Sequence, residues 1–212
     1  CKQLTLAHLE GIDPVAATLG AVNTVLFTGG RTAGFNTDTT GFAHGFAEGL
    51  PGAQLDDVVL VGGGGAGTAV ADALLRLGTG HLTIVDLDVD RAARLAAELA
   101  GRHPNSRVDA SSFDKLSALL PDSNGVVHAT PTGMAEHPGI AFDPALLHPG
   151  LWVADIVYRP LDTALLQAAR AAGCRTLDGG HMAVYQAVDA FALITGRTPE
   201  IDLEGLGLER FA

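Results

Sequence analysis

Short apolar runs alternate with amphipathic stretches through the middle of this chain, and a glycine-rich turn joins the first run to the first stretch. This alternation is typical of βαβ units around a parallel sheet. Hydrophobic residues make up 47% of the 212 residues, which is enough to fill one sizeable core. The sequence therefore predicts an α/β fold: a Rossmann-type doubly wound parallel sheet domain, plus the remnant of a second α/β domain.

The elements of the large sheet are predicted in chain order from runs of apolar residues and from glycine and proline stops. Strands are expected at residues 58–61, 82–85, near 108, 125–129, 152–156 and 175–177. Helices are expected at residues 66–77, 90–100, a short stretch ending at 121, 163–172 and 182–194. Residues 49–55 are expected to form a connector, because they include Pro51 and Gly52.

Residues 62–67, with the sequence GGGGAG, satisfy the G-x-G-x-x-G spacing between a strand and a helix. Gly62 permits the tight turn, Gly64 lets backbone N–H groups approach a pyrophosphate, and Gly67 lets the helix pack on the strand. Asp86 ends the next strand, roughly 20 residues further on. This context favours a dinucleotide over S-adenosylmethionine or a purely structural turn. The expected cofactor ligands are Gly62, Gly64, Gly65, Ala66, Gly67 and Asp86.

The acidic residue also bears on which nicotinamide cofactor is bound. A carboxylate at Asp86 can accept hydrogen bonds from both ribose hydroxyls of NAD, and it would repel the 2′-phosphate of NADP. NAD is therefore favoured over NADP. Asp88 is expected either beside the cofactor or as the N-cap of the next helix. For Arg91, a solvated helix face, stacking on adenine and a partial phosphate clamp stay open.

Composition and charge exclude several classes of partner. The chain has 24 acidic and 13 basic residues, a net charge of −11, so it has no electrostatic footprint for nucleic acid. No apolar run approaches the roughly 20 residues of a membrane span, and no signal peptide is visible, so a cytoplasmic location is expected. Cys1 and Cys174 form no disulfide framework, and the scattered histidines predict no metal site.

Several motifs, in order along the chain, resemble the shikimate/quinate dehydrogenase family, and the NAD-type quinate/shikimate dehydrogenases most. Residues 20–24 (GAVNT) and 36–41 (NTDTTG) resemble the family signature, and Lys2 stands where the family has its catalytic lysine. Residues 178–186 (DGGHMAVYQ) resemble the family's Gly-x-x-Met-Leu-x-x-Gln, with alanine where leucine is common. Residues 155–163 and 128–134 match two further family segments, the second beginning with His128 in place of the usual asparagine.

The resemblance implies an oxidoreductase that transfers hydride between NAD and a cyclic polyhydroxy acid, shikimate or quinate. Lys2 and Asp38 would form the acid–base pair, since a base must reach the hydroxyl that is oxidised. The implied substrate contacts are Asn23, Thr37, Tyr158 and Gln186. Met182 would lie against the nicotinamide and Thr130 would contact the ribose.

Each implied role has a structural alternative. Taken alone, Asp38 fits a helix N-cap and Asn23 a turn residue. His181 fits a cap or surface position better than catalysis, and we expect His128 to be structural, bonded to the backbone or buried at a strand end.

The resemblance also implies a division of the chain. Residues 1–37 with 180–212 would belong to the substrate-binding domain, whose N-terminal part, about 60 residues or more, would be missing. Residues 38–179 would form the dinucleotide-binding domain. An NADP-dependent biosynthetic shikimate dehydrogenase and a non-catalytic NAD-binding sensor remain alternatives, and the protein could be a monomer or a homodimer.

Overall fold

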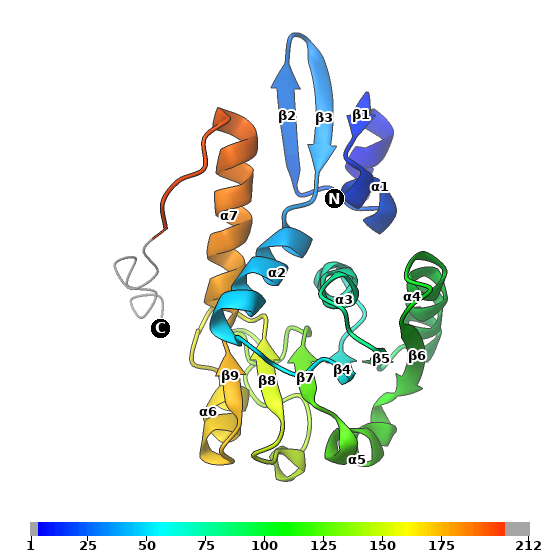
Figure 1. The fold of residues 1–212 in the computed structure, drawn as a ribbon, viewed down its shortest axis with the longest axis vertical. Coiled ribbons are helices and arrows are strands. Elements are labelled where there is room, and N and C mark those ends of the chain that lie inside the picture. The colour runs from blue at the N-terminus through cyan, green and yellow to red at the C-terminus, as the bar shows by residue number, and fades with distance from the viewer. Residues whose placement is uncertain (1–3, 202–212) are drawn as a thin grey trace.

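The computed structural model describes residues 4–201, in which a large parallel sheet lies below a small mixed sheet (Figure 1). The large sheet has the strand order β6-β5-β4-β7-β8-β9, and every neighbouring pair is parallel. Its strands are β4 (Asp57–Val61), β5 (His81–Asp86), β6 (Arg107–Ser112), β7 (Gly125–His128), β8 (Trp152–Asp155) and β9 (Arg175–Leu177). The α/β, Rossmann-type prediction is confirmed, and the order in which successive strands are added to the sheet reverses between β4 and β7.

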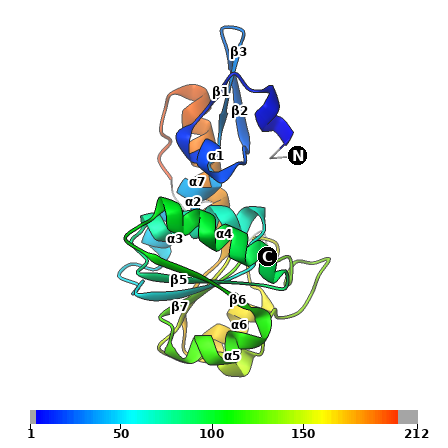
Figure 2. The same cartoon turned by 90° about the vertical axis from the view of Figure 1, so that its right-hand side faces the viewer.

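Helices cover both faces of this sheet (Figure 2). One face carries α3 (Gly65–Arg76) and α4 (Val89–Arg102), and the other carries α5 (Leu116–Leu119) and α6 (Ala164–Ala171). Short 3-10 turns occur at η2 (Phe113–Lys115), η3 (Leu120–Asp122) and η4 (Pro144–Leu146). The strands of the sheet centre are buried on both sides, which explains why they read as continuous apolar runs in the sequence.

The small sheet has the order β1-β3-β2. It comprises β1 (Gly11–Ile12), β2 (Thr24–Thr28) and β3 (Arg31–Phe35), accompanied by η1 (Leu4–His8) and α1 (Pro14–Leu19). Strands β2 and β3 form a hairpin whose two turn residues, Gly29 and Gly30, have φ values of 59° and 78°. The sequence analysis did not predict this hairpin, although a Gly-Gly pair between two short strands is a recognised signal for it.

Two helices, α2 (Asp38–Gly49) and α7 (Gly179–Thr195), pack against each other; α2 lies between the two sheets, and α7 runs from the large sheet up beside the small sheet (Figure 1). Helix α2 was not predicted, since its sequence is rich in glycine and threonine, which are weak helix formers. Gly41, Gly45 and Gly49 recur every fourth residue and so share one face. A Cβ atom at Gly41 would lie 2.6 Å from the backbone nitrogen of Gln186, so only glycine permits this approach.

The core lies on both faces of the large sheet. Phe42 and Phe46 of α2 extend it upward, and the ring of Phe46 packs edge-on against Trp152 with 4.9 Å between centroids. Helix α2 is therefore anchored to the large sheet by aromatic packing and to α7 by its glycine face. Within residues 4–201, no helix combines the length and apolar content needed to cross a bilayer.

The replacement Gly41→Ala should lower the free energy of unfolding by about 1–3 kcal/mol, because the new methyl group forces two backbones apart. Gly101→Ala in α4 is the matched control, since a Cβ there meets nothing within 4 Å and should be neutral or mildly stabilising. Urea unfolding measures both. Equal stability of the Gly41 variant and the unaltered protein would contradict this account of the helix pair.

Candidate active site

The glycine turn between β4 and α3 has the close backbone packing and the open space that a pyrophosphate requires. A Cβ atom at Gly67 would lie 1.9 Å from the carbonyl oxygen of Gly62, so glycine is needed for α3 to pack against the strand. A Cβ atom at Gly64 or Gly65 would meet nothing within 4 Å, and Gly64 caps α3 without a side-chain hydrogen bond. Open space and uncapped helix N–H groups suit a pyrophosphate.

Asp86 is buried at the end of β5 and is held by four donors. The backbone N–H groups of Gly63 and Asp88 donate to it at 2.7 and 2.9 Å, and Arg91 donates through Nε and a terminal nitrogen at 3.0 and 2.5 Å. Burial alone would raise the pKa of Asp86, but the Arg91 and backbone hydrogen bonds outweigh it and hold the pKa below its ordinary value. The carboxylate is therefore ionised and already paired with Arg91.

The half-exposed Arg91 belongs to this ion pair rather than to a free solvated face. Asp88 caps α4, since its carboxylate accepts the N–H of Arg91 at 3.0 Å, which confirms the capping alternative. The turn after β5 thus holds two carboxylates and one guanidinium, and its net charge is negative.

A second group of polar side chains gathers where the small sheet meets α2 and α7. The amide nitrogen of Asn23 donates to the hydroxyl of Thr37 at 3.1 Å and to the carboxylate of Asp38 at 2.8 Å. The Asn23 carbonyl accepts the backbone N–H of Thr37 at 3.0 Å. The hydroxyl of Thr37 also donates to the side-chain carbonyl oxygen of Gln186, a residue of α7, at 3.4 Å. Residues distant in sequence thus form one polar cluster.

Asp38 is the first residue of α2, and Thr37 occupies the cap position, so the N-cap alternative for Asp38 is wrong. Its half-buried carboxylate is turned toward Asn23. Lys2, the expected partner of Asp38 in proton transfer, lies outside the described residues.

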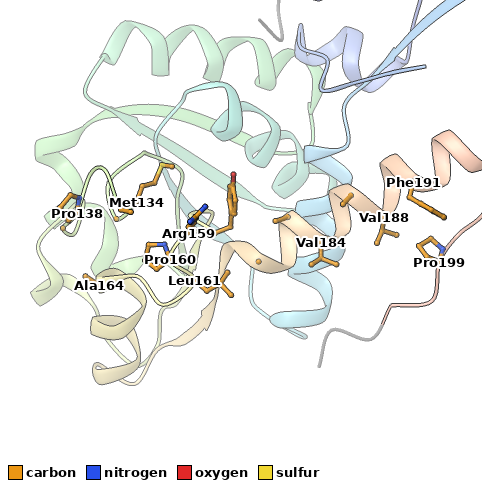
Figure 3. Close-up of a pocket in the computed structure, with 17 residues that line it drawn as sticks. Met134, Pro138, Arg159, Pro160, Leu161, Ala164, Val184, Val188, Phe191 and Pro199 are labelled. Atoms are coloured by element: carbon orange, nitrogen blue, oxygen red, sulfur yellow. The ribbon is translucent and has the colours of Figure 1, made fainter. Parts of the chain in front are cut away.

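Tyr158 and Met182, the two remaining predicted contacts on this side, differ in their surroundings. Tyr158 is exposed and lines a groove of about 1180 Å³ bordered by the apolar residues Met134, Val184 and Phe191 (Figure 3). No residue of the polar cluster lines that groove. Met182 is partly buried and packs against the core beneath α2.

Two histidines have structural partners. His128 is buried, and its partners are the side chains of Asp155 and Thr130 rather than the backbone. The sequence could not identify these partners, because they depend on strand pairing. His181, near the start of α7, is hydrogen-bonded to Asp178 at 3.3 Å, as expected of a residue at a helix start. Among residues 4–201, no group of three or more potential ligands could hold a metal ion.

Comparison with known proteins places this arrangement in context. The saccharopine dehydrogenase NADP binding domain family matches residues 58–136. The chain is 61% identical to shikimate dehydrogenase (NADP(+)) of Streptomyces avermitilis over 200 residues, covering 94% of this chain and 69% of the relative. It is 50% identical to quinate/shikimate dehydrogenase (NAD(+)) of Corynebacterium efficiens over 205 residues, covering 95% and 71%.

The chain is also similar to a solved structure. Quinate dehydrogenase from Corynebacterium glutamicum in complex with NAD superimposes with a TM-score of 0.90 at 46% identity. The match covers 99% of this chain and 72% of that one.

His181 should give the protein a measurable pH-dependent stability. Its hydrogen bond to Asp178 raises its pKa above the ordinary 6.5, against burial, which lowers it. A raised pKa stabilises the folded state below pH 6.5, and this contribution is lost as pH rises through the folded pKa. The stability deficit of His181→Gln should therefore be larger at pH 6 than at pH 8 in urea unfolding. A deficit that is constant or grows with pH would contradict the pairing.

Proposed function

The chain belongs to the shikimate/quinate dehydrogenase family, and we propose that it transfers hydride between NAD and a ring alcohol of shikimate or quinate. The observation that supports this most is the polar cluster of Asn23, Thr37, Asp38 and Gln186, held between the sheets by α2 and α7. Amides, a hydroxyl and a carboxylate offer both donors and acceptors, which a polyhydroxy ring needs. The glycine turn supplies the second binding surface.

Each group in the cluster has a proposed part. Bound nicotinamide supplies the hydride acceptor or donor. Lys2 and Asp38 exchange the proton of the reacting hydroxyl, and the 2.8 Å bond from Asn23 orients the Asp38 carboxylate. Thr37 and Gln186 hold neighbouring hydroxyls of the substrate ring, and Oγ1 of Thr37 lies 3.4 Å from Oε1 of Gln186. Met182 would reach the reactants from α7, and Tyr158 would reach them from the loop after β8.

The chain divides into two proposed lobes. Residues 1–37 with 180–212 form the substrate lobe, and residues 38–179 form the cofactor lobe. Helix α7 contacts β2 in the proposed substrate lobe and α2 in the proposed cofactor lobe, which supports an arrangement in which α7 packs against both lobes.

Charge at the turn after β5 favours NAD over NADP. Arg91 neutralises Asp86, but Asp88 stays beside them, with 3.8 Å between its carboxylate and Arg91. A 2′-phosphate would bring further negative charge to a turn that is already negative. NADP is the second candidate, because the Arg91 guanidinium lies within the same turn and could pair with a phosphate, and because the S. avermitilis relative is an NADP enzyme by name.

The direct experiment measures initial rates with shikimate and with quinate, each with NAD and with NADP, by the absorbance of the reduced nicotinamide. Turnover with NAD on either acid supports the proposal. Cofactor binding without turnover on both acids would favour the non-catalytic sensor, and a strong preference for NADP would favour the second candidate.

Asp38→Asn should lower kcat by about 10²-fold or more with little change in KM, because general acid–base catalysis contributes roughly that much. Asp122→Asn is the control, since this carboxylate is exposed in η3 on the far side of the sheet from α2. Steady-state kinetics on both acids measure the effect. An unchanged kcat for Asp38→Asn would remove the residue from the proton transfer.

Asp86→Ala should weaken NAD binding about tenfold or more and NADP binding less, since it removes acceptors for the ribose and frees Arg91 for a phosphate. Arg91→Ala is the matched variant and should weaken NADP more than NAD. Dissociation constants by titration calorimetry test both. Equal losses for the two cofactors in both variants would show that this turn does not select between them.

A further inference from the structure

We propose that His128 is a positioning residue for the cofactor and acts through the hydroxyl of Thr130; the inference rests on the proposed function. His128 ends β7 and Asp155 ends β8, and they are direct partners in the sheet. Both are buried, with 1% and 2% of their surface exposed. Nδ1 of His128 lies 2.9 Å from Oδ1 of Asp155, and Nε2 lies 2.5 Å from Oγ1 of Thr130.

The surrounding bonds fix where the protons of this network lie. Asp155 accepts the N–H of Val157 at 3.0 Å and the hydroxyl of Thr163 at 2.7 Å, so both of its oxygens act as acceptors. Nδ1 of His128 therefore donates to it. In the neutral ring, Nε2 must then accept a proton from the hydroxyl of Thr130.

This assignment determines how Thr130 meets a ligand. Its proton is committed to His128, and its oxygen accepts the N–H of Thr132 at 3.3 Å. A hydroxyl oxygen has two lone pairs, so one remains. Thr130 is thus presented as a hydrogen-bond acceptor, which suits a ribose hydroxyl.

Thr130 lies beside the glycine turn that is proposed to bind the cofactor. A Cβ atom at Gly62 would be 2.9 Å from Cγ2 of Thr130, so the loop after β7 borders the glycine turn directly. The other end of the network reaches Thr163, which caps α6 by accepting the N–H of Leu166 at 3.3 Å. One buried pair, His128 and Asp155, therefore holds both the Thr130 loop and the loop that carries Tyr158.

The variant His128→Asn separates the two bonds. Asparagine can keep a donor near the position of Nδ1 for Asp155, but it has no atom at the position of Nε2. His81→Asn is the matched control. His81 begins β5 and Asp57 begins β4, with 2.7 Å between Nδ1 of His81 and Oδ2 of Asp57. Both residues lie at the amino ends of their strands, away from the carboxyl ends where His128 and Thr130 lie.

Two measurements on the full chain test the inference: the Kd for NAD and for NADP by titration calorimetry, and the Tm by thermal unfolding. His128→Asn should raise the Kd about five- to tenfold, the cost of one lost hydrogen bond, with Tm within a few degrees of the unaltered protein. His81→Asn should leave the Kd unchanged. Thr130→Val should raise the Kd by a similar factor, and the double variant should be no worse than Thr130→Val alone, because both remove one interaction.

An unchanged Kd in His128→Asn, or losses that multiply in the double variant, would overturn the inference and leave the proposed function standing. If His128→Asn does not fold, Thr130→Val alone decides, and an unchanged Kd there overturns the inference. Failure of the unaltered chain to bind either cofactor would overturn the proposed function and this inference with it.

Discussion

The close approach of α2 and α7 is the constraint on which the rest of the site depends. The backbone nitrogen of Gln186 would lie only 2.6 Å from a Cβ atom at Gly41, so the two helices touch backbone to backbone. This contact brings the Gln186 side chain to 3.4 Å from the Thr37 hydroxyl, and Thr37 in turn lies beside Asn23 and Asp38. Any residue larger than glycine at this contact would separate the two halves of the polar cluster.

A second constraint is the reversal of strand order between β4 and β7. The loops that follow these two strands meet at the carboxyl ends of the strands, which places the glycine turn against Ala129 and Thr130. The buried pair of His128 and Asp155 extends the same edge toward α6. The loop of Thr130 and the loop of Tyr158 are thus set by hydrogen bonds that start on adjacent strand ends, rather than by loop sequence alone.

The sequence predicted the large sheet well, because its central strands are continuous apolar runs and helices α3 and α6 are followed closely by Gly78 and Gly173. Helix α2 was missed, since Gly41 and Gly45 argue against a helix until the partner at Gln186 is known. The sequence also placed Asp86 at the end of a strand, as the structure does, but could not show that Arg91, five residues on, pairs with it. Such pairing depends on how α4 starts, which is a matter of tertiary geometry.

A crystal structure of the chain with NAD and shikimate tests the central claim most directly. The account predicts that ring hydroxyls of the acid lie within hydrogen-bonding distance of Asn23, Asp38 and Gln186, with the pyrophosphate on the glycine turn at Gly64. Shikimate bound instead in the groove lined by Val184 and Phe191, without contact to Asp38, would contradict it.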